Sequence, residues 1–231
     1  MPTFVLVHGA WHGGWCWERV GALLRQAGST TYAPTLSGLA ERADLLTPSL
    51  GLEAHVADIV RLIERHALRD VVLVGHSYSG AVVTVAADRL PGRIARVVYL
   101  DAVVPQNGQC LFDCSSSKFR SRIEEQVRTQ GDGWRIPPPS PESLGLVKDA
   151  DIEWVMPRLT PHPCRSFRDP VALQGRPVAR TYINCIDTRT PGAERSPQAA
   201  GIEDYHELSC GHDAMVTAPL ELAQLLSRIC A

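Results

Sequence analysis

The segment that most constrains the fold of this chain lies at residues 71–87. A β-branched apolar run at 71–74 ends at Gly75, and Ser77 follows two positions later. The residues after Ser77 are mostly small and compatible with a helix. A strand, a sharp turn bearing one serine and a helix lift the serine hydroxyl above the carboxyl end of a sheet. The pattern therefore predicts that Ser77 is a nucleophile, for which the rest of the chain must supply a base, an acid and an oxyanion site.

The turn departs from the usual Gly-x-Ser-x-Gly pattern at its fifth position. Ser79 stands there, and Gly80 follows one place later. Serine is small enough to fit such a turn, so the departure weakens the pattern only slightly. The alternative role for Ser77 is a helix N-cap, which is common after a strand. The glycine at position 75 and the small residues that follow favour the nucleophile.

The composition limits the classes of partner. Of the 231 residues, 45% are hydrophobic and 21% are charged, which is ordinary for a globular protein that buries a sizeable core by itself. The formal net charge is −2 and the charges are interspersed, so neither nucleic acid nor a membrane surface is expected as a partner. No apolar run approaches the ~20 residues that crossing a bilayer requires.

Seven cysteines are scattered along the chain without a Cys-x-x-Cys pair. Their odd number and their spacing indicate reduced thiols that serve mostly as packing residues, and no metal site is predicted. A strand pattern that begins at Thr3 leaves no room for a charged region and a cleavable apolar segment. We therefore expect a cytoplasmic protein.

Short apolar runs alternate with amphipathic segments over most of the chain. The runs typical of strands lie at residues 4–7, 30–34, 71–74, 94–100, 178–185 and 204–208. An apolar stripe at 52–63 predicts one of the intervening helices, with about four turns. Because the strands are nearly continuous in apolar residues and helices separate them, the chain predicts an α/β fold. Its mostly parallel sheet should be covered on both faces.

One region interrupts this alternation. Residues 105–175 contain no clear strand, many prolines, and the tryptophans Trp134 and Trp154. A connection this long inside a compact domain is rarely a plain loop. We expect a helical cap at 105–175, inserted into an α/β core that is formed by residues 1–104 and 176–231.

His212 is the candidate general base. The base should come late in the chain, after the last strand, and His212 lies there in a loop just before the final helix. His206 is the competitor, but its neighbours are typical of a strand interior. The other histidines lack this placement, and we expect His55 and His66 to lie on a helix surface.

Two aspartates at strand ends are candidates for the acid that orients the histidine. Asp187 follows the penultimate strand, and Asp101 follows the strand at 94–100. Asp187 is favoured, because the order Ser, Asp, His with the acid on the penultimate strand is the commoner arrangement. Asp101 is the alternative acid, and Glu194, in a polar loop, is a weaker third choice. Either aspartate could instead cap a turn.

Two backbone N–H groups are expected to hold the oxyanion. Tyr78, directly after the nucleophile, supplies one, and the loop after the first strand supplies the other from Ala10. The glycines at 13 and 14 lack both the Gly-x-Gly-x-x-Gly spacing and a Walker lysine, so a nucleotide role is rejected.

With these residues in place, the chain resembles the α/β-hydrolases, specifically their hydroxynitrile lyase and plant methylesterase branch. The resemblance rests on Phe-Val-Leu-Val-His-Gly-Ala-Trp-His-Gly-Gly-Trp-Cys-Trp at 4–17, Gly-His-Ser-Tyr at 75–78 and Gly-His-Asp-Ala-Met at 211–215. It covers the expected core well and the cap poorly. It implies an α/β-hydrolase fold and carboxylester hydrolysis without a cofactor. Bacterial members of similar size hydrolyse esters, including carbamate-type ones.

Two departures from this branch are informative. Its cyanohydrin-cleaving members carry a lysine directly after the catalytic histidine, where this chain has Asp213, which argues against lyase activity. Asp187 lies about one place nearer to its strand tyrosine than the family acid does, which keeps Asp101 open.

We therefore predict a serine hydrolase that cleaves a small carboxylic or carbamate-type ester through an acyl-enzyme. Trp11, Trp134 and Trp154 are the candidate lining of a largely apolar pocket, and the two cap tryptophans could equally be core of the cap. Amidase or lactonase activity would use the same residues, and a non-hydrolytic ligand receptor or a lyase is the alternative class. The expected partner is a small-molecule ester, and the sequence does not predict the oligomeric state.

Overall fold

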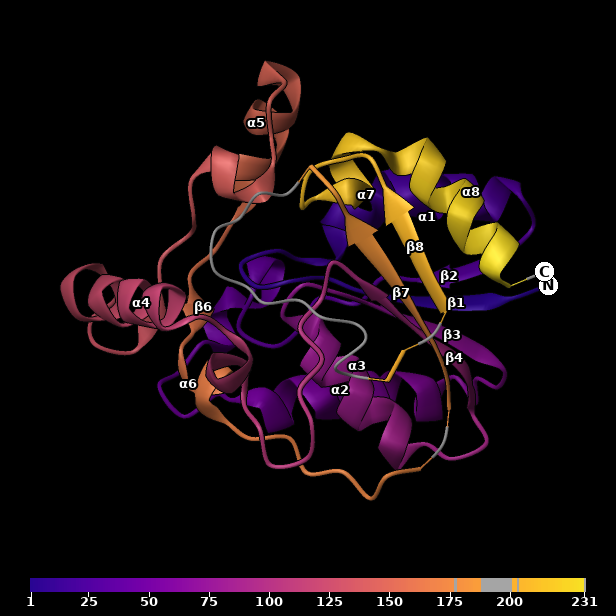
Figure 1. Ribbon diagram of the computed structural model, residues 1–231, viewed down its shortest axis with the longest axis horizontal. Helices are drawn as coiled ribbons and strands as arrows, with labels where there is room; N and C mark the ends of the chain where they lie inside the picture. The colour runs from indigo at the N-terminus through magenta and orange to yellow at the C-terminus, as the bar shows by residue number, and fades with distance from the viewer. Residues whose placement is uncertain (177, 188–200, 203, 231) are drawn as a thin grey trace.

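A six-stranded sheet forms the centre of the molecule (Figure 1). The computed structural model describes residues 1–176, 178–187, 201–202 and 204–230. The strands follow the order β2-β1-β3-β4-β7-β8, and every neighbouring pair is parallel, so the predicted fold is confirmed. Their bounds are β1 Thr3–Val7, β2 Thr30–Tyr32, β3 Val71–His76, β4 Ile94–Leu100, β7 Ala179–Cys185 and β8 Asp204–Leu208.

The side chains of β1 show why the strands are nearly continuous in apolar residues. Phe4 and Leu6 pack in one buried cluster, whereas Val5 and Val7 pack in another. Successive residues of a strand point to opposite faces of the sheet. Because both faces are covered, each face needs apolar side chains, and the alternation of apolar with polar residues disappears.

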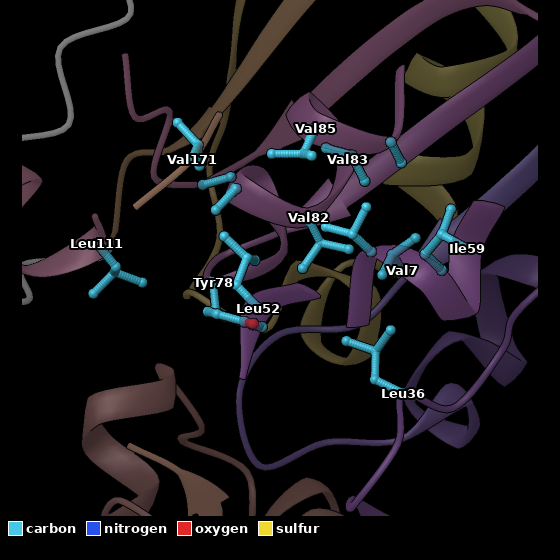
Figure 2. Packing of buried hydrophobic residues seen from close by; sticks show 14 of the residues in the cluster. Val7, Leu36, Leu52, Ile59, Tyr78, Val82, Val83, Val85, Leu111 and Val171 are labelled. Atoms are coloured by element: carbon cyan, nitrogen blue, oxygen red, sulfur yellow. The ribbon is translucent and has the colours of Figure 1, made fainter. Parts of the chain in front are cut away.

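Helices cover both faces of the sheet. The pair α1 and α8 lies on one face, and the pair α2 and α3 lies on the other (Figure 1). Figure 2 shows Val7, Ile59 and Val82 gathered in the cluster on the α2–α3 side. The core helices are η1 Gly14–Trp17, α1 Glu18–Gln26, η2 Ala40–Leu45, α2 Leu52–Arg65, α3 Ser79–Arg89, α7 Ala214–Thr217 and α8 Pro219–Ile229, of which η1 and η2 are 3₁₀ helices. No helix within the described ranges combines the length and hydropathy that a membrane span requires.

Strands β3 and β4 end side by side at one edge of the sheet. The last residue of β3, His76, pairs with the last residue of β4, Leu100. The Ser77 N–H donates to the Leu100 carbonyl oxygen at 3.1 Å, and the Asp101 N–H donates to the Ile183 carbonyl oxygen at 2.8 Å. The sheet ladder therefore brings Ser77 and Asp101 to adjacent positions at its carboxyl edge.

The chain between β4 and β7 forms a set of short elements. They are η3 Leu111–Cys114, α4 Ser117–Gln130, β5 Arg135–Ile136, η4 Pro141–Leu144, α5 Asp149–Val155, η5 Met156–Arg158, β6 His162–Pro163 and α6 Arg165–Arg168. The antiparallel pair of β5 and β6 was not predicted, because two-residue strands have no periodicity to detect. In Figure 1, α4 and α5 lie on the side of the molecule toward which the strand arrows point.

Candidate active site

The turn between β3 and α3 holds Ser77 in an unusual backbone conformation. Its φ is 54°, in the left-handed region that residues with a side chain rarely adopt. Such conformations cluster at active sites. Small neighbours make the turn possible, because a Cβ at Gly75 would lie 2.8 Å from the Ser79 carbonyl oxygen. A Cβ at Gly80 would overlap the Val103 carbonyl oxygen.

Ser79, the departure from the usual motif, links the serine turn to the loop after β1. Its side chain is fully buried, and its hydroxyl donates to the carbonyl oxygen of His8. A glycine at this position has no hydroxyl and cannot make the bond. The fifth position of the motif therefore contributes a contact of its own between two segments of the site.

His212 lies in the loop between β8 and α7, where the sequence predicted the base. Its Nε2 lies 2.9 Å from the Ser77 Oγ, which is within reach for proton transfer. The competitor, His206, lies within β8, and its Nε2 is 3.1 Å from Asp204 Oδ1. The structure thus brings His212 to the serine and holds His206 in the sheet.

Asp101 is the aspartate that contacts His212. Its Oδ2 lies 2.5 Å from the His212 Nδ1, and its side chain is only 1% exposed. Because a carboxylate only accepts, Nδ1 donates to it, and Nε2 is left to accept from the Ser77 hydroxyl. The imidazole is therefore held in the tautomer that a general base needs.

The geometry favours Asp101 over Asp187, the aspartate that the sequence favoured. Asp187 is exposed, and its backbone N–H donates to the Cys210 carbonyl oxygen. Strand β4 is the direct neighbour of β3, whereas β7 lies one strand further away. At Asp101 the backbone turns sharply with a φ of 43°. The closeness of β4 to β3 therefore favours Asp101, although an acid on the penultimate strand is the commoner arrangement. Glu194, the third choice, lies outside the described residues.

The N–H groups of Ala10 and Tyr78 are available beside the serine. Both residues line the same pocket as Ser77. Among the described residues, neither N–H has an acceptor within hydrogen-bond distance. The loop after β1 approaches closely because of Gly9, where a Cβ would lie 2.8 Å from His76 Nδ1 and 3.1 Å from the Ser77 Cβ. Two unengaged N–H groups beside a nucleophile can hold a developing oxyanion.

A pocket opens at these groups. Its lining is mostly apolar, with a few polar side chains, as is usual for small-molecule sites. The lining residues are Ala10, Trp11, Ser77, Tyr78, Val103, Leu111, Ser115, Phe119, Arg122, Pro139, Ser143, Leu144, Phe167 and His212. Within the described ranges, no group of His, Cys, Asp or Glu side chains gathers as metal ligands would.

Trp134 and Trp154, unlike Trp11, are not in this lining. The Trp154 ring packs edge-on against Trp15, with centroids 5.2 Å apart, and the Arg19 guanidinium lies 4.8 Å from its centroid. Trp134 is held through its carbonyl oxygen, which accepts from the Cys164 N–H at 2.9 Å. Trp154 therefore packs the insertion against the core helices, and neither tryptophan lines the pocket.

His55 contacts the side chain of Tyr78, a contact that the sequence did not predict. It is fully buried instead of lying on a helix surface. Its Nε2 donates to the Ser37 carbonyl oxygen at 2.9 Å, and its Nδ1 accepts from the Tyr78 hydroxyl at 2.8 Å. Burial lowers the pKa of His55 to about 4, so the ring is neutral. The signal was its spacing, because positions 52, 55 and 59 share one apolar helix face.

Known proteins resemble this chain along its whole length. A sequence profile of the alpha/beta hydrolase family matches residues 4–225. A carbendazim hydrolyzing esterase from Nocardioides sp. (strain SG-4G) is 36% identical over 248 residues, which cover 99% of this chain and 100% of that protein. Methylesterase 10 from Arabidopsis thaliana is 26% identical over 256 residues, which cover 99% of this chain and 91% of that protein.

Solved structures share the same fold. An extracellular alpha/beta-hydrolase from a Paenibacillus species matches with a TM-score of 0.87 and 24% identity, over 99% of this chain and 98% of that one. The crystal structure of polyneuridine aldehyde esterase matches with a TM-score of 0.77 and 21% identity, over 100% of both chains. At these identities the structural matches support the fold alone.

Proposed function

The chain belongs to the α/β-hydrolase family and is an esterase of its methylesterase branch, and we propose that Ser77, His212 and Asp101 form its catalytic triad. The observation that carries the proposal is the position of the His212 ring. It lies 2.9 Å from the Ser77 Oγ on one side and 2.5 Å from the Asp101 Oδ2 on the other. A nucleophile, a base and an orienting acid are thereby aligned.

Acylation begins when the Ser77 Oγ attacks the ester carbonyl carbon while His212 Nε2 takes the hydroxyl proton. The negative charge that develops on the carbonyl oxygen is held by the N–H groups of Ala10 and Tyr78. Asp101 accepts from the Nδ1–H and stabilises the imidazolium. Collapse of the tetrahedral intermediate breaks the bond to the alcohol oxygen, and His212 returns its proton to that oxygen.

Deacylation repeats these steps with water. His212 takes a proton from a water molecule, whose oxygen attacks the acyl carbon of the ester on Ser77. The bond to the Ser77 Oγ then breaks, and the oxygen regains the proton from His212. One ester and one water are converted into one acid and one alcohol, and the enzyme is restored.

For the substrate, we propose a small carboxylic ester or a carbamate-type ester. The mostly apolar lining of the pocket suits a small or aromatic acyl group. The relative that is 36% identical is named for the hydrolysis of carbendazim, a carbamate ester, which supports the carbamate class. The cyanohydrin-cleaving members carry a lysine where this chain has Asp213, which is buried against His12. Residue 213 therefore supplies a carboxylate, and not the lysine ammonium that would stabilise cyanide.

The insertion at 105–175 is the cap in this proposal. Leu111, Phe119 and Phe167 extend from it into the pocket lining, which supports a role in substrate selection. A cytoplasmic location is also part of the proposal. It is supported by the odd number and the scattered spacing of the seven cysteines, which are typical of reduced thiols.

Burst kinetics with p-nitrophenyl acetate test the triad. The wild-type protein should release a burst of nitrophenol that matches the enzyme concentration. Ser77→Ala should abolish the burst and lower kcat by about 10⁴-fold or more. Full turnover by Ser77→Ala would overturn the mechanism, and binding without turnover by the wild type would favour the receptor class. A panel of methyl esters, methyl carbamates, amides and lactones then ranks the substrate classes by kcat/KM.

A further inference from the structure

A second histidine–carboxylate pair lies behind the candidate site. His12 Nε2 is 3.0 Å from Asp213 Oδ2, and His12 Nδ1 is 2.8 Å from the Ala10 carbonyl oxygen. The side chains of His12 and Asp213 are 1% and 0% exposed. Asp213 directly follows His212, and Ala10 is the proposed oxyanion donor. The pair therefore joins the two loops that carry these groups.

The partners of His12 fix its protonation state. A carbonyl oxygen and a carboxylate oxygen only accept, so both ring nitrogens must carry hydrogen. Although burial alone would lower the pKa of His12, the Asp213 carboxylate raises it above its ordinary value. Burial alone would raise the pKa of Asp213, but the charge of His12 lowers it. The contact is thus an imidazolium–carboxylate ion pair inside the protein.

The neighbouring buried histidines differ from His12. His8 Nε2 accepts from the Leu36 N–H at 3.0 Å, so that nitrogen carries no hydrogen, and burial lowers the pKa of His8 to about 3. His76 donates from Nε2 to the His212 carbonyl oxygen at 2.9 Å, and burial lowers its pKa well below the ordinary value. These two rings are neutral, which leaves His12 as the cation that balances Asp213.

The sheet itself does not connect the two loops. They follow β1 and β8, and three strands separate β1 from β8 in the sheet order. Hydrogen bonds between neighbouring strands therefore do not fix the distance between these two loops, and side-chain contacts must fix it. The His12–Asp213 pair crosses this gap, and the hydrogen bond from His76 to the His212 carbonyl oxygen reinforces it.

We propose that His12 and Asp213 are a positioning pair, which sets the distance between the oxyanion donor Ala10 and the base His212 and cancels the Asp213 charge near that base. The proposal rests on the proposed triad and oxyanion site. A misplacement of about 1 Å in such a site can slow a reaction by about 100-fold. An unbalanced Asp213 carboxylate would in addition favour the protonated form of His212.

The groups that face His212 determine how strongly the Asp213 charge affects its protonation. Its Nδ1 contacts Asp101, its Nε2 contacts Ser77, and its ring centroid lies 4.5 Å from that of His76. The charge of Asp213 also acts on His212. Asp101 is present in every variant below, and His76 stays neutral, so only the balance between His12 and Asp213 changes.

The test compares His12→Gln, Asp213→Asn and the double variant, with p-nitrophenyl acetate as substrate. We expect His12→Gln to lower kcat by about 10- to 100-fold with little change in KM. It should also move the acid limb of kcat/KM to higher pH by about one unit, because Asp213 then lacks its cation. Asp213→Asn should lower kcat without that movement. The double variant, which has no unpaired charge, should restore the wild-type acid limb.

The exposed His66→Gln is the control and should keep the wild-type profile.

A measurement on the wild-type protein avoids variants that fail to fold. Nitrogen-15 spectra of the eight histidines should show one ring with both nitrogens protonated at about pH 8. Eight neutral rings at that pH would overturn the ion pair. An acid limb or a kcat unchanged in folded His12→Gln would overturn the positioning role. Full turnover by Ser77→Ala would instead overturn the triad. The failure of the positioning pair and the failure of the triad are therefore distinguishable.

Discussion

The carboxyl edge of the sheet and the insertion between β4 and β7 build one pocket in different ways. At the edge, hydrogen bonds of the ladder place the residues, as when the Ser77 N–H bonds to Leu100. In the insertion, the described strands are two residues long, and Phe119 and Phe167 reach the pocket by side-chain packing. We infer that the reaction depends on residues at the sheet edge and that substrate choice depends on residues of the insertion.

The largest expected effect separates the two strand-end aspartates. Asp101→Asn should lower kcat by about 10³- to 10⁴-fold, because the amide no longer holds His212 in the correct tautomer. Asp187→Asn should change kcat by no more than about twofold, since Asp187 is exposed. Steady-state kinetics of both variants, with circular dichroism as a check of folding, provide the measurement. The reverse ranking would make Asp187, which follows β7, the acid of the triad.

A pair of glycines compares how closely the two regions are packed. Gly80→Ala should lower the free energy of unfolding by about 2–4 kcal/mol, because the added Cβ meets the Val103 backbone. Gly133→Ala, in the insertion, adds a Cβ with nothing within 4 Å and should cost about 1 kcal/mol through its φ of 80°. Urea unfolding measures both values. Equal losses would contradict the contrast between edge and insertion.

The smallest expected effect lies within the insertion itself. Phe119→Ala should change KM for aromatic esters by about threefold to tenfold, because Phe119 lines the pocket. Trp154→Ala should leave KM unchanged and lower the free energy of unfolding by about 1–3 kcal/mol, because the Trp154 ring packs on Trp15. Michaelis constants and urea midpoints for both variants decide this. A large KM change in Trp154→Ala would indicate that the Trp154 ring contacts the substrate.

The sequence predicted the fold and the positions of Ser77 and His212 because each has a local signal. The apolar run that ends at Gly75, followed by small residues, has one structural solution, a strand that turns sharply into a helix. His212 was found from its position after the last strand of the pattern. These inferences needed only the chain order, which is written in the sequence.

The contacts that the sequence did not predict join segments that are distant in the chain. Asp101 contacts His212 across 111 positions, and either strand-end aspartate satisfied the pattern before the register was known. His12 and Asp213 are 201 positions apart, and no local periodicity relates them. His55 had a local signal in its helix face, but its partner Tyr78 came only with the packing of α2 on α3.

The sequence by itself determined a parallel α/β sheet, a serine on a sharp turn and a histidine after the last strand, because strand, turn and helix signals are local. The tertiary structure decided which carboxylate contacts His212, which contacts His12, and which aromatic residues line the pocket. The physical reason is that strand order and side-chain packing bring distant residues to within hydrogen-bond reach. Asp101 and Asp213, each at the end of a different strand or loop, acquire different partners only through that packing.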